Sequence, residues 1–230
     1  MGNEMNNNDI DGLVRYLGGL VTTHKRQLID EVLAKRTRLL TVVLENIFQP
    51  HNASAVLRSC DCFGVQDIHI VENTNEFTVS PKVTQGSSKW LNLEKYKEGE
   101  GSIEYCISKL KNKGYQIVAT TPRKDCPSIY DYEIQGKTAL LFGTELTGLS
   151  SSALSMADDQ VYIPMYGFTE SFNISVSAAL CLNIFRHKLE HSGLDWRLSA
   201  KEKQEIRLEW YKKIVKNKEI ILSNYQQGDR

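Results

Sequence analysis

The chain has 230 residues, of which 41% are hydrophobic, so it can form one large α/β domain with terminal additions or two small domains. Its formal net charge is zero, because 28 Lys and Arg residues balance 28 Asp and Glu residues. This balance removes the simplest argument for a nucleic-acid partner, a basic chain, but it excludes no class of protein.

Cysteine usage and hydropathy bear on the cellular compartment. The five cysteines form no Cys-x-x-Cys pair; they are Cys60, Cys62, Cys106, Cys126 and Cys181. An odd number in this arrangement predicts reduced thiols and no zinc or other metal site. The polar start of the chain does not resemble a secretory signal, and no apolar run is long enough to span a bilayer. We therefore expect a cytoplasmic protein without a membrane partner.

Strands alternate with helices along the middle of the chain. Runs of apolar and β-branched residues predict strands at 39–47, 65–71, 115–121, 138–142 and 160–165. Helical spacing of apolar residues predicts helices at 10–36, 53–63, 102–113, 149–157, 173–191 and 199–222. This alternation favours an α/β fold, with a parallel sheet whose strands are covered by helices on both faces.

The two ends read as helical extensions of this core. We expect an amino-terminal extension at 1–38, the α/β domain at 39–193 and a carboxyl-terminal extension at 194–230. Both ends are basic, with five Lys or Arg against two Asp or Glu in 24–38, and eight against five in 201–230. A solvated helix face explains this excess as readily as a phosphate-binding surface does.

A long polar segment, 72–100, lies between the second strand and the next helix. It contains Ser80-Pro81 and a Gly-Ser-Ser-Lys-Trp run at 86–90, but no strong periodic pattern. A segment of this length without a pattern predicts a functional or mobile excursion from the fold.

Three loops at expected strand ends carry the unusual polar residues: 48–58, 143–149 and 164–173. Ligands of α/β proteins bind outside the carboxyl ends of the strands, so these loops are the expected site. No Gly-x-Gly-x-x-Gly fingerprint, Walker A sequence or nucleophile elbow is present. From the residues alone, the chain is predicted to be an α/β protein that binds a small nucleotide-like ligand.

Arg58 and Glu145, in these loops, could each have either a ligand-binding role or a structural role. A partly buried Arg58, in the second turn of a helix that begins at Ala53, could clamp a phosphate or pair with Asp61. Glu145, between glycines, could accept a bond from a ligand or fix its own loop. Ser171 and Asn173 are candidates for the N-cap of the helix expected at 173–191.

Three stretches resemble the motifs of the SpoU, or TrmH, branch of the SPOUT RNA 2′-O-methyltransferases. They are ENIFQPHNASAVLRSCDCFGV at 45–65, LFGTELTGLS at 141–150 and IPMYGFTESFNISVSAAL at 163–180. The motifs occur in the family order, and the resemblance spans about 40 to 190. The terminal helices are similar to those of tRNA-modifying members rather than to members with an additional amino-terminal RNA-binding domain.

The resemblance implies a parallel α/β sheet whose carboxyl-terminal part forms a trefoil knot, and a homodimer that assembles two sites. It implies S-adenosyl-L-methionine (AdoMet) as cofactor, bound at Thr120, Gly143, Ile163 and Phe172. The third motif usually has Leu at the last of these positions, so the adenine pocket of this chain is expected to differ there. The positions associated with activity are Arg58, Asn52, Glu145, Ser171 and Asn173.

The implied reaction is methylation of a ribose 2′-hydroxyl in RNA, with a D-loop guanosine of tRNA as the expected target. A guanidinium is a poor base at neutral pH, so we expect Arg58 to fix a phosphate and stabilise the developing alkoxide. The basic ends are expected to contact tRNA phosphates. Ribosomal RNA remains an alternative substrate, and a non-catalytic RNA-binding relative remains an alternative function. A nicotinamide oxidoreductase is disfavoured because the glycine fingerprint is missing.

Overall fold

The computed structural model describes residues 7–47, 49–72, 78, 80–97, 102–216 and 225. The chain divides into two compact units, of which the larger comprises Thr37–Trp196. The smaller unit joins Met1–Arg36 to Arg197–Arg230. The two terminal segments, expected as separate extensions, belong to one unit.

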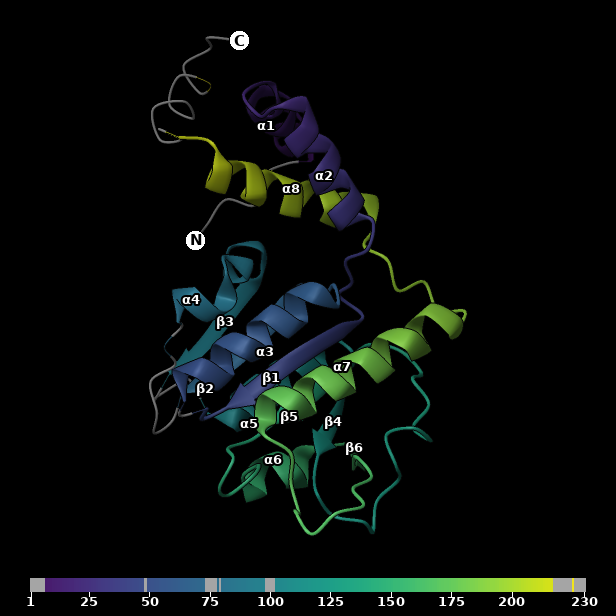
Figure 1. Ribbon diagram of the computed structural model, residues 1–230. Coiled ribbons are helices and arrows are strands. Elements are labelled where there is room, and N and C mark those ends of the chain that lie inside the picture. Colours follow the sequence, from purple (N-terminus) through teal and green to yellow (C-terminus); the bar gives the residue numbers. More distant parts are fainter. Residues whose placement is uncertain are drawn as a thin grey trace. The chain divides into compact units, whose positions relative to one another are not determined.

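A six-stranded sheet forms the centre of the larger unit (Figure 1). Its strands are β1 (Leu40–Glu45), β2 (Asp67–Glu72), β3 (Asn92–Lys97), β4 (Gln116–Thr120), β5 (Thr138–Phe142) and β6 (Asp159–Val161). The order across the sheet is β3-β2-β1-β5-β4-β6, and every pair of neighbours is parallel. The carboxyl ends of all six strands therefore lie along one edge.

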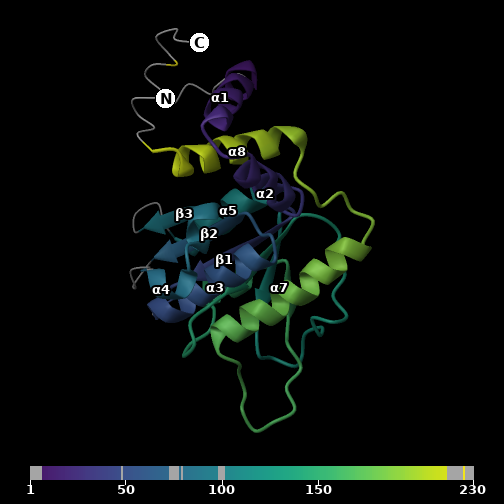
Figure 2. The ribbon, with the colours of Figure 1, turned by 45° about the horizontal axis from the view of Figure 1, so that its top comes forward.

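Helices connect the strands and cover the sheet. They are α3 (Pro50–Cys62), α4 (Pro81–Thr84), the 3-10 helix η1 (Ser87–Trp90), α5 (Ile103–Asn112), α6 (Ser151–Met156) and α7 (Ile174–His191). Helices α3 and α7 lie side by side on one face (Figures 1 and 2). Helices α5 and α6 pack with one another on the other face.

Two hydrophobic cores confirm that both faces are covered. On β5, Leu140 and Phe142 belong to the core beneath α3 and α7, whereas Ala139 and Leu141 belong to the core beneath α5. Successive side chains of a strand point to opposite faces, so a strand buried on both sides must be apolar at every position. The predicted parallel α/β sheet is thus confirmed, and the 138–142 strand has the predicted bounds.

The expectation of a patternless excursion at 72–100 is wrong in part, because β3 lies within it. Among the described residues, this strand pairs with β2 alone and buries only Tyr96, while Lys95 forms an ion pair with Glu72 on the neighbouring strand. An edge strand has one covered side and commonly carries lysines, which removes the hydrophobic signal that reveals central strands. Residues 73–77, 79 and 98–100 lie outside the described residues.

Most element boundaries differ from those expected by a few residues, and two of these differences lie next to the candidate site. Helix α3 begins at Pro50 instead of Ala53, because proline at the first helical position costs no hydrogen bond and its fixed φ suits a helix. Strand β6 ends at Val161, short of the expected Met165. Gly64 and Gly114, which follow the helices expected at 53–63 and 102–113, both have positive φ, at 75° and 80°, as is common just after a helix end.

The smaller unit contains α1 (Asn7–Gly19), α2 (Thr23–Leu33) and α8 (Ala200–Ile214). A capping box begins α8, since Ser199 and Glu202 exchange hydrogen bonds. The expected helical residues 217–222 lie outside the described residues. Arg36 is 1% exposed and its guanidinium lies 5.4 Å from the centre of the Trp210 ring, so this basic residue is not available to a phosphate.

No helix among the described residues is both long enough and apolar enough to cross a bilayer.

Candidate active site

A hydrogen-bonded chain of side chains joins three segments of the protein at the carboxyl ends of the strands. Asn52, in the first turn of α3, donates from Nδ2 to Oε1 of Glu145, in the loop after β5. The same amide nitrogen lies 3.1 Å from Oε1 of Gln49. The amide oxygen of Asn52 accepts a 3.2 Å bond from Nδ2 of Asn173, just before α7. Three residues that the resemblance associates with activity are therefore in contact.

Asn173 also caps α7, as predicted. Its Oδ1 accepts bonds from the backbone nitrogen of Ser175, at 2.9 Å, and from the hydroxyl of the same residue, at 2.6 Å. A side chain that satisfies an unpaired N–H at a helix start stabilises the helix by about 1 kcal/mol. The cap fixes the amide with its nitrogen toward Asn52, which is only 5% exposed and has both ends of its own amide bonded.

Backbone geometry holds the Glu145 loop in place. The backbone groups of Thr144 and Gly148 exchange two hydrogen bonds, of 3.0 and 3.1 Å. A Cβ on Gly143 would lie 2.2 Å from the backbone carbonyl of Gly148, so only glycine permits this approach. Gly148 has a φ of +70°, which also favours glycine. The loop thus closes on itself and presents Glu145 beside Asn52.

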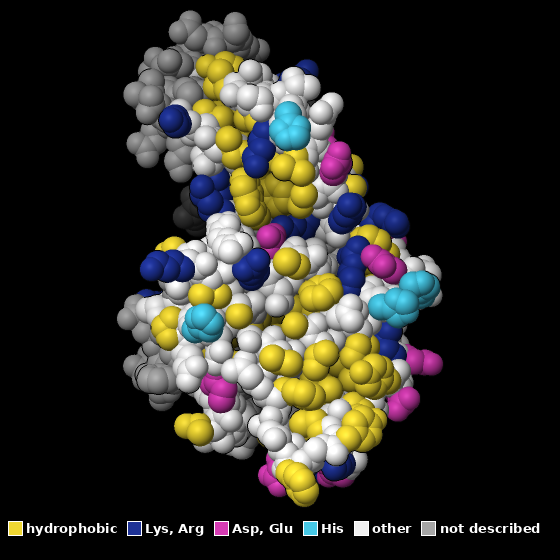
Figure 3. All heavy atoms as spheres, in the orientation of Figure 1, with side chains coloured by type: hydrophobic (Ala, Val, Ile, Leu, Met, Phe, Trp, Pro, Cys, Tyr) yellow, Lys and Arg dark blue, Asp and Glu magenta, His cyan; other side chains and the backbone are white. Residues whose placement is uncertain are grey.

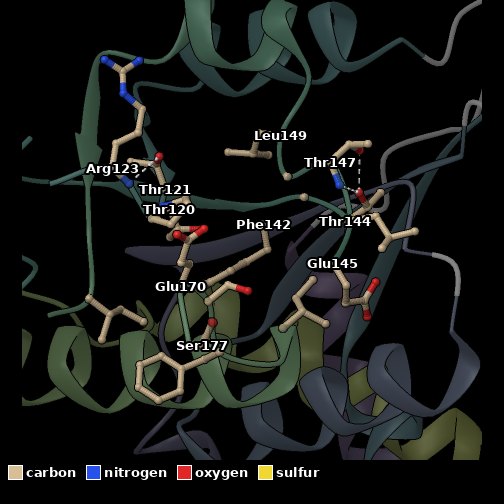
Figure 4. A pocket seen from close by; sticks show the side chains of 18 of the residues that line it. Thr120, Thr121, Arg123, Phe142, Thr144, Glu145, Thr147, Leu149, Glu170 and Ser177 are labelled. Atoms are coloured by element: carbon tan, nitrogen blue, oxygen red, sulfur yellow. Dashed lines mark hydrogen bonds between the residues drawn. The ribbon is translucent and has the colours of Figure 1, made fainter. Parts of the chain in front are cut away.

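A pocket of about 430 Å³ opens beside this hydrogen-bonded chain, at the ends of β4, β5 and β6 (Figure 4). Its volume lies in the usual range for small-molecule sites. Its apolar lining includes Phe142, Leu149, Val161 and Met165. All four positions assigned to the cofactor from the resemblance line it: Thr120, Gly143, Ile163 and Phe172. The structure therefore brings these four positions together, and Glu145 and Ser171 line the same pocket.

Phe172 and Ser171 lie in the loop before α7, and both are exposed. Thr120 is fixed at the end of β4, where its hydroxyl donates a 2.7 Å bond to the carbonyl of Leu141 on β5. Ile163 follows β6 and is partly buried against the core under α7.

Arg58 departs from the expectation, because its side chain is exposed rather than partly buried. Since α3 begins at Pro50, this residue lies about two turns along the helix, and the neighbouring Leu57 and Cys60 occupy the face toward the sheet. Among the residues that the structure describes, Arg58 forms no hydrogen bond or ion pair, so the alternative pairing with Asp61 does not occur. Arg58 does not line the pocket.

Sequence reasoning missed several side chains of the site. Gln49 and Ser175, which bond to the two asparagines, gave no signal of their own beside the motifs. Glu170 and Arg123 line the pocket but were not assigned to it. The loop that carries Arg123 has no periodic pattern, so only the fold could place it there.

None of the cysteines lines the pocket. All five cysteines are free. Within the described part of the chain, no group of three or more His, Cys, Asp or Glu side chains could hold a metal ion.

Comparison with known proteins identifies the family. The model of the SpoU rRNA Methylase family matches residues 39–183. The chain is 43% identical over 213 residues to a tRNA (guanosine(18)-2′-O)-methyltransferase of Borreliella burgdorferi, covering 93% of this chain and 96% of that protein.

Solved structures agree in fold. The TrmH/SpoU tRNA modifying enzyme of A. aeolicus has a TM-score of 0.75 and 33% identity, covering 84% of this chain and 98% of that chain. The SpoU methyltransferase AviRb of Streptomyces viridochromogenes, solved with AdoMet, has a TM-score of 0.60 and 23% identity, covering 71% and 65%. The second likeness concerns the fold alone. The resemblance predicted from the three motifs is confirmed, and the chain belongs to the SpoU methylase family.

Proposed function

We propose that this chain transfers a methyl group from AdoMet to the ribose 2′-hydroxyl of guanosine 18 in the D-loop of tRNA. The observation that carries the proposal is the hydrogen-bonded chain of Asn52, Glu145 and Asn173 beside a ligand-sized pocket. The 43% identity to a tRNA (guanosine(18)-2′-O)-methyltransferase over nearly the whole chain supports the substrate.

The pocket suits AdoMet chemically. This cofactor supplies a methyl group activated by a positively charged sulfonium. Apolar walls such as Phe142 and Leu149 suit its adenosine, while the carboxylates of Glu145 and Glu170 favour a cation. Thr120, Gly143, Ile163 and Phe172 would hold it. A SpoU methyltransferase of the same fold has been solved with AdoMet, which supports the same cofactor class here.

The hydrogen-bonded chain is proposed to position the ribose. Methyl transfer requires the 2′-oxygen in line with the transferred group, so much of the rate enhancement comes from orientation. Because Asn52 occupies Oε1 of Glu145, the second carboxylate oxygen is left to accept a bond from a ligand hydroxyl. Asn173 holds Asn52 in the amide orientation that this requires. Ser171, at the pocket edge, is proposed to contact the same substrate.

Arg58 is proposed to bind a phosphate next to the reacting ribose and to stabilise the developing alkoxide. A guanidinium is a poor general base at neutral pH, whereas its planar fork matches a phosphate. The exposed side chain, without a partner among the described residues, is available for that contact.

The homodimer and the trefoil knot, both implied by the resemblance, belong to this proposal. Large hydrophobic side chains are exposed near the pocket: Leu146, Tyr166, Phe168, Phe172 and Val176. Hydrophobic side chains gather over α7 and the loops beside it (Figure 3). Exposed apolar patches of this kind mark interaction sites, which supports a second copy of the chain as partner.

The cellular setting follows from the proposed substrate. A tRNA-modifying enzyme with five free cysteines fits a reducing cytoplasm. Exposed lysines of the smaller unit, such as Lys201, are proposed to contact tRNA phosphates.

Transfer of labelled methyl from AdoMet to unmodified tRNA transcripts tests the proposal. We expect label in 2′-O-methylguanosine, and its loss when position 18 is adenosine. Methyl transfer to ribosomal RNA fragments but not to tRNA would show that the substrate is ribosomal RNA. AdoMet binding without any methyl transfer would favour a non-catalytic RNA-binding protein.

A further inference from the structure

One basic side chain lines the pocket together with two acidic ones. Arg123 is the only Lys or Arg among the described lining residues, and Glu145 and Glu170 are the only Asp or Glu. Figure 4 shows the two carboxylates coming from different loops and the guanidinium extending away from them. Neither motif resemblance nor the hydrogen-bonded chain accounts for Arg123.

The backbone that carries Arg123 is anchored at both sides of the residue. The nitrogen of Thr121 donates a 3.0 Å bond to the carbonyl of Val161 on β6. Further along, Tyr162 donates a 3.1 Å bond to the carbonyl of Pro127. The nitrogen of Arg123 itself donates to the hydroxyl of Thr121, at 3.2 Å. These bonds fix the backbone on both sides of Arg123 at the pocket edge.

The guanidinium is held in its present direction by an exposed carboxylate two residues along the chain. Arg123 donates from Nε to Oδ1 of Asp125 at 3.1 Å, and from a terminal nitrogen to Oδ2. Both side chains are more than half exposed. Exposed ion pairs contribute at most about 1 kcal/mol and are weakened by salt, so a ligand carboxylate can replace Asp125 at little cost.

The charges of the pocket mirror those of the proposed cofactor. AdoMet carries two positive groups, the sulfonium and the ammonium, and one negative group, the carboxylate. The pocket offers two carboxylates and one guanidinium. We propose that Arg123 binds the carboxylate at the amino-acid end of the cofactor, exchanging Asp125 for it. This assignment rests on the proposed function and names a residue for one end of its ligand.

An RNA phosphate is the other anion that could reach the pocket edge. The cofactor carboxylate is favoured because Arg123 lines the same pocket as the four cofactor positions, whereas Arg58 lies outside it. Binding measurements without RNA separate these two sources.

The test compares two ligands that differ at the amino-acid end. S-adenosylhomocysteine retains that end, methylthioadenosine lacks it, and both are uncharged at sulfur. Dissociation constants are measured by calorimetry for the full chain and for Arg123→Gln, Asp125→Asn and Lys124→Gln. The last variant removes a positive charge from an exposed neighbour that does not line the pocket.

We expect Arg123→Gln to raise the dissociation constant of S-adenosylhomocysteine about tenfold and to leave that of methylthioadenosine unchanged, because a charged hydrogen bond is lost only with the first ligand. Asp125→Asn should lower the dissociation constant of S-adenosylhomocysteine a few-fold, and Lys124→Gln should change the binding of neither ligand. Equal effects of Arg123→Gln on both ligands, or an effect confined to the KM for tRNA, would overturn the assignment. If the unaltered chain bound neither ligand, the proposed function itself would fail.

Discussion

Asn52 donates a hydrogen bond to Glu145 across a separation of 93 residues, linking the first turn of α3 to the loop after β5. Both residues follow adjacent parallel strands, β1 and β5, so the sheet brings them together. The amide also accepts a bond from Asn173, and its buried polar atoms are thereby satisfied. An amide suits this position because it donates to a carboxylate and accepts from a second amide at once.

Replacing Asn52 by Asp should break this arrangement through charge rather than size. Two carboxylates would then face each other at hydrogen-bond distance in a mostly buried place, which raises the pKa of one of them. We expect a loss of about 2 kcal/mol in the free energy of unfolding at pH 7.5, and a loss of methyl transfer.

Measured at pH 5.5, Asn52→Asp should recover part of its stability relative to the unaltered chain, because one shared proton restores a bond between the two carboxyl groups. Asn52→Ala serves as the matched control, since it removes the amide without adding charge. Denaturant unfolding at both pH values checks the prediction. An equal deficit for Asn52→Asp at both pH values would show that repulsion is not the cause.

Gly143→Ala should destroy the loop that presents Glu145. The added methyl group would lie 2.2 Å from the backbone of Gly148, and backbone cannot yield as a flexible side chain does. Gly136→Ala is the matched control, because a Cβ there meets nothing within 4 Å. We expect only Gly143→Ala to lose S-adenosylhomocysteine binding, as measured by calorimetry. Unaltered binding by that variant would contradict the described loop geometry.

Strands that are covered on both faces could be predicted from the sequence. The strand at 138–142 is apolar at every position because both its faces are covered, and its bounds were correct. Strand β3 was missed because an edge strand with a single buried residue resembles a polar loop. Local hydrogen bonds, such as those of the Ser199 and Glu202 capping box, could be predicted from the sequence because both partners lie within one helical turn.

The candidate site could be predicted only as a set of loops. Motif resemblance selected Asn52, Glu145 and Asn173, but their mutual bonds depend on contacts between segments far apart in sequence. The expected partial burial of Arg58 is wrong because the buried Val56, Leu57 and Cys60 define the face of α3 toward the sheet, and Arg58 lies off that face. No pattern could place Arg123 in the pocket, since the fold alone carries its loop there.

His69, on β2, should make the free energy of unfolding depend on pH. The residue is 4% exposed, and burial lowers the pKa of its imidazole to about 4, although Glu94 and Asp67 act in the opposite direction. Its Nδ1 lies 2.8 Å from the hydroxyl of Tyr96. Between this pKa and the ordinary value of about 6.5, the unfolded chain binds a proton that the folded chain does not, so stability falls as pH falls through that window.

His69→Gln should flatten this dependence between pH 6.5 and about 4, because an amide retains a bond to Tyr96 without titrating. Replacement of the exposed His24 by Gln is the control and should leave the slope as it is. Unfolding free energies at several pH values check the prediction. A slope that persists in His69→Gln would assign the acid sensitivity to other groups.

Arg58→Lys tests whether a guanidinium fork is required. An ammonium keeps the charge but cannot bind a phosphate through two parallel bonds. We expect kcat for tRNA methylation to fall by about two orders of magnitude, within the range found for the loss of one transition-state donor. S-adenosylhomocysteine binding should be unchanged, because the residue does not line the pocket. Near-normal turnover by Arg58→Lys would contradict the proposal that the Arg58 guanidinium binds a phosphate through two parallel bonds.

The proposed function is tested most directly by mapping the methylated nucleotide in a tRNA transcript after incubation with the protein and AdoMet. Alkaline cleavage of RNA requires a free 2′-hydroxyl, so a methylated ribose leaves a gap in the cleavage ladder. The proposed function predicts a single gap at guanosine 18, and no label transfer to a transcript with 2′-deoxyguanosine at that position. A gap elsewhere, or methyl transfer to the deoxy transcript, would contradict it.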